Sequence, residues 1–372
     1  MLLLALFARC KDPYTSPYTA PPTGYLVVEG YITDSAPRIT LSRTVPVAQN
    51  PKLVGESGAV VQVEGEDNST KILTMQDSGV YTIDTLPLNP AIKYRLRIHT
   101  KDGKEYLSDY CPFQSTPPID SINWVVDGDY LEIYANTHDP THLNHYYQWD
   151  YEETWEYFTT MVSIWKYQSP PPEVVPRPPD EQINTCWGSR ISTSIMLQST
   201  AQLSDDLIYN KLLTKVVGKS LDLSSRFTIL VHQYALSEDA YNYQTLMQKN
   251  SESLGSIFDA QPSNLQSNIH NTTNPSDRVI GYVSVGKARQ QRIWITRSQL
   301  PYEWYYSYTC EIPSFKVPKD SVTYYFAGQG YTPINEYYND LGILTGYWAN
   351  ETKCVDCRTQ GGKNRKPSFW PN

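Results

Sequence analysis

The sequence predicts a mainly β protein, and three observations lead to this fold class. Short runs of β-branched and aromatic residues recur along the chain, and turn residues separate them at intervals of roughly 8–12 residues. The 27 prolines and 19 glycines are scattered without a period, which indicates many turns. The 30 tyrosines and nine tryptophans outnumber the eight phenylalanines, as expected for rings on half-buried sheet faces. A chain of 372 residues is long enough for two domains.

The charge balance argues against nucleic acid as a partner. The net charge is −8 and the pI is about 5.3, whereas contacts to phosphates need a basic face. The basic residues Lys363, Arg365 and Lys366 form the single cluster of positive charge, and we interpret it as a solvated tail.

Residues 1–23 are predicted to be a signal remnant, a lipidation site and a tether. The apolar run MLLLALFAR is too short to cross a bilayer, and Cys10 follows it directly. A polar, proline-rich segment comes next, which is the order found in bacterial lipoproteins. Arg9 departs from the small residue that usually precedes such a cysteine. We therefore expect a lipid on Cys10 that attaches the chain to a membrane; the alternative is a buried N-terminal strand, which the prolines disfavour.

Residues 24–115 are predicted to form a first β-sandwich. Tyr25–Thr33, Ala59–Gly65 and Ile92–His99 have strand composition, and Asp102-Gly103 supplies a turn. The phrase GVYTIDTLPLNPAIKYRLRIHTKDGKEYLSD resembles the end of a transthyretin-like or carboxypeptidase-regulatory-like sandwich. Modules of that kind usually act as spacers or docking domains.

Residues 116–300 are predicted to form a second β-sandwich with an inserted helix. Thr116-Pro117-Pro118 marks the boundary, and the strand pair that follows resembles the opening of a fibronectin-III-like domain. Residues 186–217 are ambiguous between strand and short helix. Residues 237–249 predict an amphipathic helix with Ser237 as its N-cap, followed by a turn anchored by Phe258 and a strand over Val279–Val285.

Residues 301–372 are predicted to be an irregular, aromatic-rich extension that ends with a Cys-x-x-Cys motif. The motif, Cys354 and Cys357, lacks the second ligand pair of a zinc ribbon and the βαβ context of a thioredoxin-like site. In an exported chain, one or both cysteines are expected to pair with Cys310 or Cys186 and to clamp the extension onto the body. A direct Cys354–Cys357 disulfide is the alternative.

The segment from residue 146 to residue 158 alternates aromatic and acidic residues and is a candidate contact surface. Aromatic rings stack on sugars and also form protein contacts, but in a strand about half of them point inward. Core packing, contact with a protein partner and ligand binding therefore remain open. The candidate contact residues are Tyr146, Trp149, Tyr151, Trp155, Tyr157 and Trp165.

Three histidines in a short segment are the best candidates for a metal site. His138, His142 and His145 lie beside Asp139, but Pro140 prevents one helix from carrying all three. Because no general-base motif accompanies them, we interpret the segment as a polar loop and expect no metal.

No pattern in the sequence indicates catalysis. Glu152, Glu153 and Glu156 lie in a charge-rich phrase, and no spacing singles out an acid and a base. The sequence contains no nucleophile elbow, P-loop or dinucleotide-binding motif in its required context. We therefore expect a protein without enzymatic activity and without a cofactor.

Three phrases together resemble one known family. They are LVVEGYI near the N-terminus, QYALSEDAYNYQTLMQ with GSIFDAQPSNLQSNIHN and NPSDRVIGYVSV in the middle, and CVDCRTQGGKNRKPSFW at the end. The chain resembles a Bacteroidota outer-membrane lipoprotein family catalogued as domain of unknown function 4249. The resemblance implies a lipid-anchored outer-membrane protein, exposed at the cell surface, that serves as an accessory or substrate-capture partner of a TonB-dependent transporter. The alternatives are a structural or assembly lipoprotein that binds other envelope proteins and, third, a surface enzyme acting on glycans.

Overall fold

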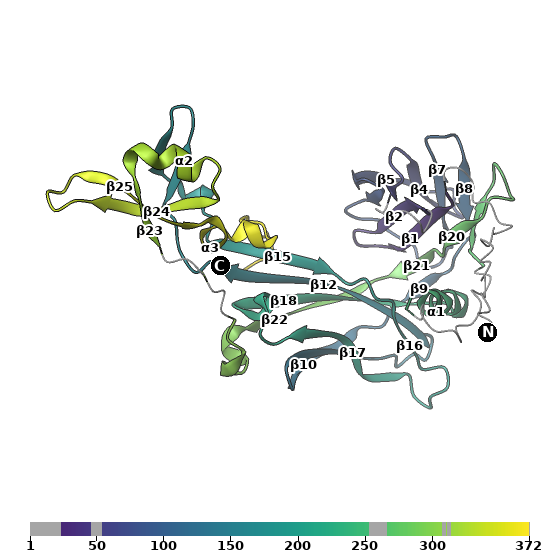
Figure 1. Ribbon diagram of the computed structural model, residues 1–372. Helices are drawn as coiled ribbons and strands as arrows, with labels where there is room; N and C mark the ends of the chain where they lie inside the picture. Colours follow the sequence, from purple (N-terminus) through teal and green to yellow (C-terminus); the bar gives the residue numbers. More distant parts are fainter. Residues whose placement is uncertain (1–23, 46–53, 253–265, 307–309, 311–313, 372) are drawn as a thin grey trace, which may run out of the picture. The chain divides into compact units, whose positions relative to one another are not determined.

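The computed structural model describes residues 24–45, 54–252, 266–306, 310 and 314–371. Strands dominate these residues and helices are few, which confirms the mainly β fold class (Figure 1). Cys10, with the rest of residues 1–23, and the predicted turn at Phe258 lie outside the described residues. No helix among the described residues is long and apolar enough to span a bilayer.

The chain divides into two compact units, and neither unit is continuous in sequence. Unit 1 comprises residues 1–114 and 260–286, and unit 2 comprises residues 115–259 and 287–372. The predicted boundaries differ from this division, because they place residues 260–286 in the second domain. The physical reason for the difference is strand pairing, since the strands of this segment complete the sheet of unit 1.

Unit 1 is built on a sheet of 12 strands with the order β19-β8-β7-β4-β5-β6-β2-β1-β21-β9, with β20 beside β1 and β3 beside β2. The strands are β1 (Leu26–Thr33), β2 (Arg38–Arg43), β3 (Val54–Gly55), β4 (Val60–Gly65), β5 (Thr70–Asp77), β6 (Val80–Thr82), β7 (Tyr94–His99), β8 (Glu105–Ser108), β9 (Phe113–Ser115), β19 (Ile269–Asn271), β20 (Val279–Gly281) and β21 (Ser284–Lys287).

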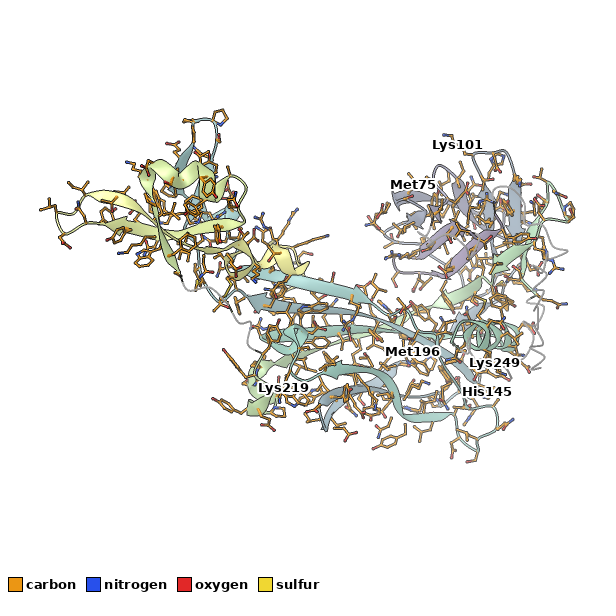
Figure 2. All side chains as sticks on the ribbon, viewed as in Figure 1. Met75, Lys101, His145, Met196, Lys219 and Lys249 are labelled. Atoms are coloured by element: carbon orange, nitrogen blue, oxygen red, sulfur yellow. A yellow bond between two sulfur atoms is a disulfide. The ribbon has the colours of Figure 1, made fainter. Side chains whose placement is uncertain are left out.

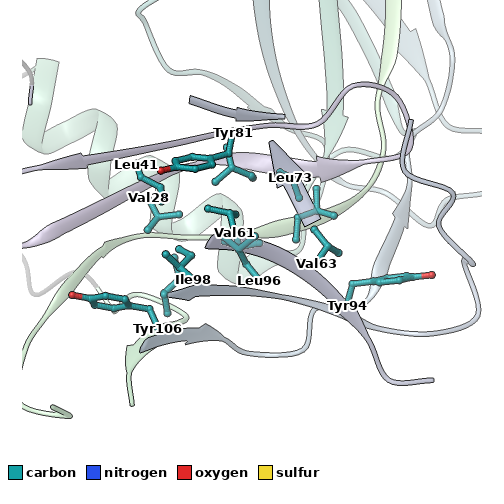
Figure 3. Packing of buried hydrophobic residues seen from close by; sticks show 14 of the residues in the cluster. Val28, Leu41, Val61, Val63, Leu73, Tyr81, Tyr94, Leu96, Ile98 and Tyr106 are labelled. Atoms are coloured by element: carbon teal, nitrogen blue, oxygen red, sulfur yellow. The ribbon is translucent and has the colours of Figure 1, made fainter. Parts of the chain in front are cut away.

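The core of unit 1 follows from the period of two along its strands. Val61 and Val63 of β4 and Leu96 and Ile98 of β7 are buried, while the residues between them are more exposed. Figure 3 shows these side chains packed together, with the ring of Tyr81 in the same cluster. The alternation that predicted these strands therefore also builds the core.

Two strands of the returning segment pair with β1 in parallel. β20 and β21 both run parallel to β1, so the single strand predicted over Val279–Val285 is wrong. The interruption begins at Gly281, whose φ is 140°. A Cβ atom at this position would lie 2.1 Å from the carbonyl oxygen of Val28, so the close approach to β1 requires glycine.

The body of unit 2 consists of two sheets that share one core. Residues 186–217, which were ambiguous from sequence, are strands with connecting turns. Ile133 from one sheet and Trp149 and Ile229 from the other belong to the same buried cluster, an arrangement consistent with the predicted sandwich. The first sheet is β10 (Ile119–Asp127), β11 (Tyr130–His138) and β17 (Leu207–Val217); the second is β15 (Thr185–Ile191), β12 (Tyr146–Phe158), β18 (Arg226–Ala235) and β22 (Arg289–Thr296), with β16 (Met196–Ser199) also paired to β12.

The predicted helix is present as α1 (Glu238–Glu252) and packs against β12 and β16. The hydroxyl of Ser237 accepts a hydrogen bond from the backbone N–H of Ala240 at 3.2 Å, which is the expected N-cap contact. Ala240 and Tyr243 are buried against the body of unit 2. The helix continues past residue 249, where the prediction ended it.

The C-terminal part of unit 2 is ordered, so the prediction of an irregular extension is wrong. A three-stranded sheet forms there, and its cluster includes Val317, Tyr347 and Ala349. Val174 joins the same cluster, because residues 165–176 fold into the hairpin β13–β14. The elements are β13 (Trp165–Gln168), β14 (Glu173–Pro176), β23 (Phe315–Pro318), β24 (Tyr331–Tyr338), β25 (Leu344–Glu351), α2 (Val322–Phe326) and α3 (Thr352–Val355).

Six short 3-10 helices complete the described elements. They are η1 (Pro179–Glu181), η2 (Leu221–Leu223), η3 (Arg297–Gln299), η4 (Tyr302–Trp304), η5 (Lys319–Ser321) and η6 (Cys357–Gln360).

Candidate functional site

The aromatic ladder of β12 faces the interior of unit 2. Its aromatic residues fall mostly at odd positions, and the odd positions of this strand point toward the core. Trp149 and Tyr157 have exposed fractions of 0% and 1%. The indole N–H of Trp149 donates to Oε1 of Gln233 at 2.9 Å, and the Tyr157 hydroxyl donates to the carbonyl oxygen of Cys357 at 2.9 Å. These two residues are therefore not available as a contact surface, which corrects that part of the prediction.

The other four candidate contact residues are half-buried against the protein itself. The Tyr146 ring lies 4.9 Å from the ring of Tyr241 in α1, and the Arg190 guanidinium lies 5.3 Å above the Trp155 ring. Tyr151 packs against the core of unit 2, and Trp165 packs in the C-terminal sheet region. The structure therefore shows these rings mainly as packing elements.

The histidine segment forms a carboxylate-centred cluster. The Nδ1 atoms of His142 and His145 lie 2.7 and 2.6 Å from the two carboxylate oxygens of Asp206, which is buried (Figure 2 labels His145). Burial acts to raise the pKa of Asp206, but hydrogen bonds from Thr200 and the two histidines lower it. His138 lies apart from this cluster and contacts Asp120 instead. Within the described residues, no group of three or more His, Cys, Asp or Glu side chains is arranged to hold a metal ion.

A buried carboxylate lies inside the sandwich at Glu153. Its exposed fraction is 0%, and Nε of Arg190 donates to its Oε2 at 2.7 Å. Arg190 also lies 3.1 Å from a carboxylate oxygen of Asp222. Burial raises the pKa of Glu153 even though Arg190 opposes the effect. Because Arg190 bridges both acids, they form a structural ion-pair network and not a free acid and base.

A histidine–carboxylate pair lies on the opposite face of β12 and β18. Nδ1 of His232 lies 2.6 Å from Oδ1 of Asp150, and the Tyr234 hydroxyl donates to Oδ2 of Asp150 at 3.0 Å. Burial acts to lower the pKa of His232, but Asp150 raises it overall. No serine, threonine or cysteine of the described residues is seen hydrogen-bonded to this imidazole, as nucleophilic catalysis would require.

Two disulfides hold the C-terminal part of unit 2 in place. Cys186 pairs with Cys357, and Cys310 pairs with Cys354. Cys186–Cys357 joins the C-terminal extension to the body as expected, whereas Cys310–Cys354 links two parts of the extension itself. The alternative Cys354–Cys357 disulfide is wrong. Cys111 is a buried free thiol in unit 1, and burial together with Asp109 raises its pKa to about 11.

A pocket lies beside these disulfides, entirely within unit 2. Its volume is about 480 Å³, a size suited to a small ligand. Three separate parts of the chain line it, within residues 166–183, 326–333 and 356–364. The lining residues are Lys166, Tyr167, Arg177, Asp180, Glu181, Ile183, Phe326, Tyr331, Thr332, Pro333, Asp356, Arg358 and Asn364.

The pocket combines paired charges with an aromatic wall. Nζ of Lys166 donates to both carboxylate oxygens of Glu181 at 2.8 and 2.7 Å. The guanidinium of Arg358 binds the carboxylate of Asp356, with the closest contact at 2.6 Å. These two acids are held in ion pairs, so the arrangement suits binding by charge and stacking more than acid–base catalysis.

Sequence reasoning missed this pocket, although it came close to parts of it. Lys166 and Tyr167 directly follow the predicted contact residue Trp165, and Asp356 and Arg358 flank the second cysteine of the Cys-x-x-Cys motif. Arg177 lies in a second proline-rich stretch, residues 169–180, where no sequence pattern indicates a binding site. The lining residues come together only through contacts between distant parts of the chain, and no single segment of the sequence indicates these contacts.

Comparison with known protein families identifies the family of this chain. A family model described as a domain of unknown function, DUF4249, matches residues 11–292. The chain belongs to this family. The matched region of this DUF4249 chain covers β1 to the first half of β22. It includes the part of the pocket contributed by residues 166–183 but not the parts after residue 300.

No curated protein matches the DUF4249 chain. Among solved structures, similarity is found to a pullulanase complexed with maltotriose from Anoxybacillus sp. LM18-11, at 11% sequence identity and a TM-score of 0.15. The match covers 56% of this chain and 24% of the pullulanase chain. A likeness of this degree carries no information about function.

Proposed function

We infer that this protein is a lipid-anchored outer-membrane protein, exposed at the cell surface, that captures a small ligand as an accessory partner of a TonB-dependent transporter. The observation that carries the proposal is the pocket in unit 2, which two disulfides frame and which contains charged and aromatic side chains. A site of this kind binds a ligand without changing it, so no enzymatic activity is proposed.

Two further features support the proposed location. Disulfides form and persist in oxidising compartments outside the cytoplasm, and four of the five cysteines after Cys10 are paired. The apolar run followed by Cys10 fits the signal of a lipoprotein. The transporter partnership rests on the family resemblance stated above.

The partnership is tested by affinity purification from membranes extracted with a mild detergent, followed by mass spectrometry. We expect a TonB-dependent barrel to be enriched with the wild-type protein. If repeated purifications recover no such barrel, the partnership is wrong.

The lipid anchor has a separate test. Cys10→Ala in the full-length precursor should release the protein from the membrane fraction, because the sulfur that carries the lipid is missing. The matched control is Cys111→Ala, which also removes an unpaired cysteine and should leave the protein in the membrane. Continued membrane retention of Cys10→Ala would refute lipidation at this residue.

A structural or assembly role is the second candidate, and one observation favours it. The β24–β25 hairpin carries Tyr338, Leu341 and Ile343 with exposed fractions of 48%, 82% and 57%. Exposed apolar side chains so close together are typical of protein contacts. The same purification separates the two roles, since an assembly protein would recover other envelope proteins in place of the barrel.

A further inference from the structure

Arg177 differs from the other cations of the pocket because no carboxylate of the described residues forms an ion pair with it. Its guanidinium donates to the carbonyl oxygens of Trp165 at 2.9 Å and Glu181 at 3.5 Å. Its Nε atom is buried and has no hydrogen-bond partner. A guanidinium offers five N–H donors, so several, including the buried Nε–H, have no acceptor among the described residues.

The neighbouring acids compensate this charge only in part, because each is already paired with another cation. Glu181 is paired with Lys166, and Asp356 is paired with Arg358. Burial lowers the pKa of Arg177, and the positive charge of Arg358 lowers it further. The remaining acid, Asp180, is exposed to solvent. Among the three cations that line the pocket, Arg177 is therefore the one without a carboxylate partner.

We propose that the pocket binds a small monocarboxylate with an apolar or aromatic body, and that Arg177 holds the carboxylate. This inference deepens the proposed function, because it names the class of ligand that is captured. A carboxylate matches the planar guanidinium and would supply the acceptors that the unused donors lack. The rings of Tyr167, Phe326 and Tyr331 would contact the apolar body.

The same charges argue against a dianion such as a phosphate ester. Three carboxylates, those of Asp180, Glu181 and Asp356, line the pocket. The cations Lys166, Arg177 and Arg358 balance them, so the second negative charge of a dianion finds no further cation, whereas a single negative charge needs only Arg177.

The test compares closely matched probes on the intact, disulfide-bonded protein. 4-Fluorophenylacetate, its neutral amide and 4-fluorophenyl phosphate are titrated and followed by fluorine NMR. We expect the carboxylate to bind about tenfold or more tightly than the amide, because a charge-assisted hydrogen bond is lost with the amide. We also expect it to bind more tightly than the phosphate.

Three variants assign the effect to Arg177. Arg177→Met should remove the preference for carboxylate over amide, and Arg177→Lys should retain part of it because the charge remains. Arg365→Met is the matched control: it removes an exposed arginine that follows the lining residue Asn364 but does not itself line the pocket, and it should keep the full preference. Melting temperatures establish that each variant is folded.

The inference is overturned if wild-type protein binds the amide or the phosphate as tightly as the carboxylate, or binds none of the probes. It is also overturned if a folded Arg177→Met protein keeps the preference. None of these results depends on the transporter. The proposed partnership with a transporter is tested separately by the purification from membranes. The chemistry of the ligand and the identity of the partner are thus tested separately.

Discussion

Replacing Cys310 and Cys354 together by alanine should destabilise the C-terminal part of unit 2. The disulfide joins residues 44 positions apart, and the loop-entropy model gives about 4 kcal/mol for a loop of that length. Cys354 is fully buried beside Ile183 and Val355, so alanine is preferred to serine because it leaves no unpaired hydroxyl. Measured disulfide contributions often fall below the model, and we expect a loss of about 2–4 kcal/mol.

The loss is measured by urea unfolding followed by tryptophan fluorescence and far-ultraviolet circular dichroism. Cys111→Ala is the control, because it removes a buried cysteine that has no disulfide, and it should cost about 1 kcal/mol. A loss below about 1 kcal/mol in the double variant, with an unchanged m-value, would refute the view that this bond clamps the region. Removing the Cys186–Cys357 bond, which joins residues 171 positions apart, should cost somewhat more, about 5 kcal/mol in the same model.

Three further predictions test other parts of the fold. Arg190→Met should lower the free energy of unfolding by about 1–2 kcal/mol at pH 8 and by less at pH 5. The reason is that the folded-state pKa of Glu153 is raised, so its ionised form destabilises the protein as pH rises, and the variant lacks the cation that offsets this effect. Equal losses in urea unfolding at the two pH values would contradict the argument. Ser237→Ala should cost about 1 kcal/mol and Ser237→Asp much less, and unchanged amide exchange at the start of α1 in the alanine variant would show that the cap contributes nothing. Because the pKa of its thiol is about 11, Cys111 should resist iodoacetamide at pH 8 in the native protein and react after unfolding. Peptide mapping by mass spectrometry measures this reaction, and rapid alkylation of the native protein would contradict the burial of Cys111.

Features that local sequence determines were predictable. The helix after Ser237 has its cap, its first-turn acids Glu238 and Asp239, and an apolar side that includes Tyr243, all within one short segment. The end of the helix was less certain, because Asn250 is compatible both with a terminus and with continuation. The number of possible disulfide pairings could also be limited from sequence, because only five cysteines follow Cys10.

Features that depend on distant contacts were not predictable. Nothing in Val279–Val285 indicates that it pairs with β1, because the pairing partner lies about 250 residues earlier and no turn sets the register. The aromatic residues of β12 show alternation, but the pattern alone does not say which face is covered. The structure resolves that choice by placing Tyr147 and Trp149 in the core.

The pocket, too, could not be predicted from local sequence. Arg177, Arg358 and Tyr331 come from three segments, and each is unremarkable among its neighbours in sequence. Their meeting depends on the hairpin β13–β14, the C-terminal sheet and two disulfides. The candidate contact residue Trp165 is adjacent in sequence to Lys166 and Tyr167, but no sequence pattern indicated the side chains that line the pocket.

Unit 1 is built from two segments that are far apart in the sequence, and this has a consequence for the newly synthesised chain. β1 leaves the ribosome 253 residues before Val279, its first parallel partner, which corresponds to about 12–50 s at roughly 5–20 residues per second. During that interval one edge of β1 has unsatisfied backbone groups that can pair with another chain. A newly made polypeptide is therefore open to aggregation through this edge, and every truncation that stops before residue 279 leaves it permanently unpaired.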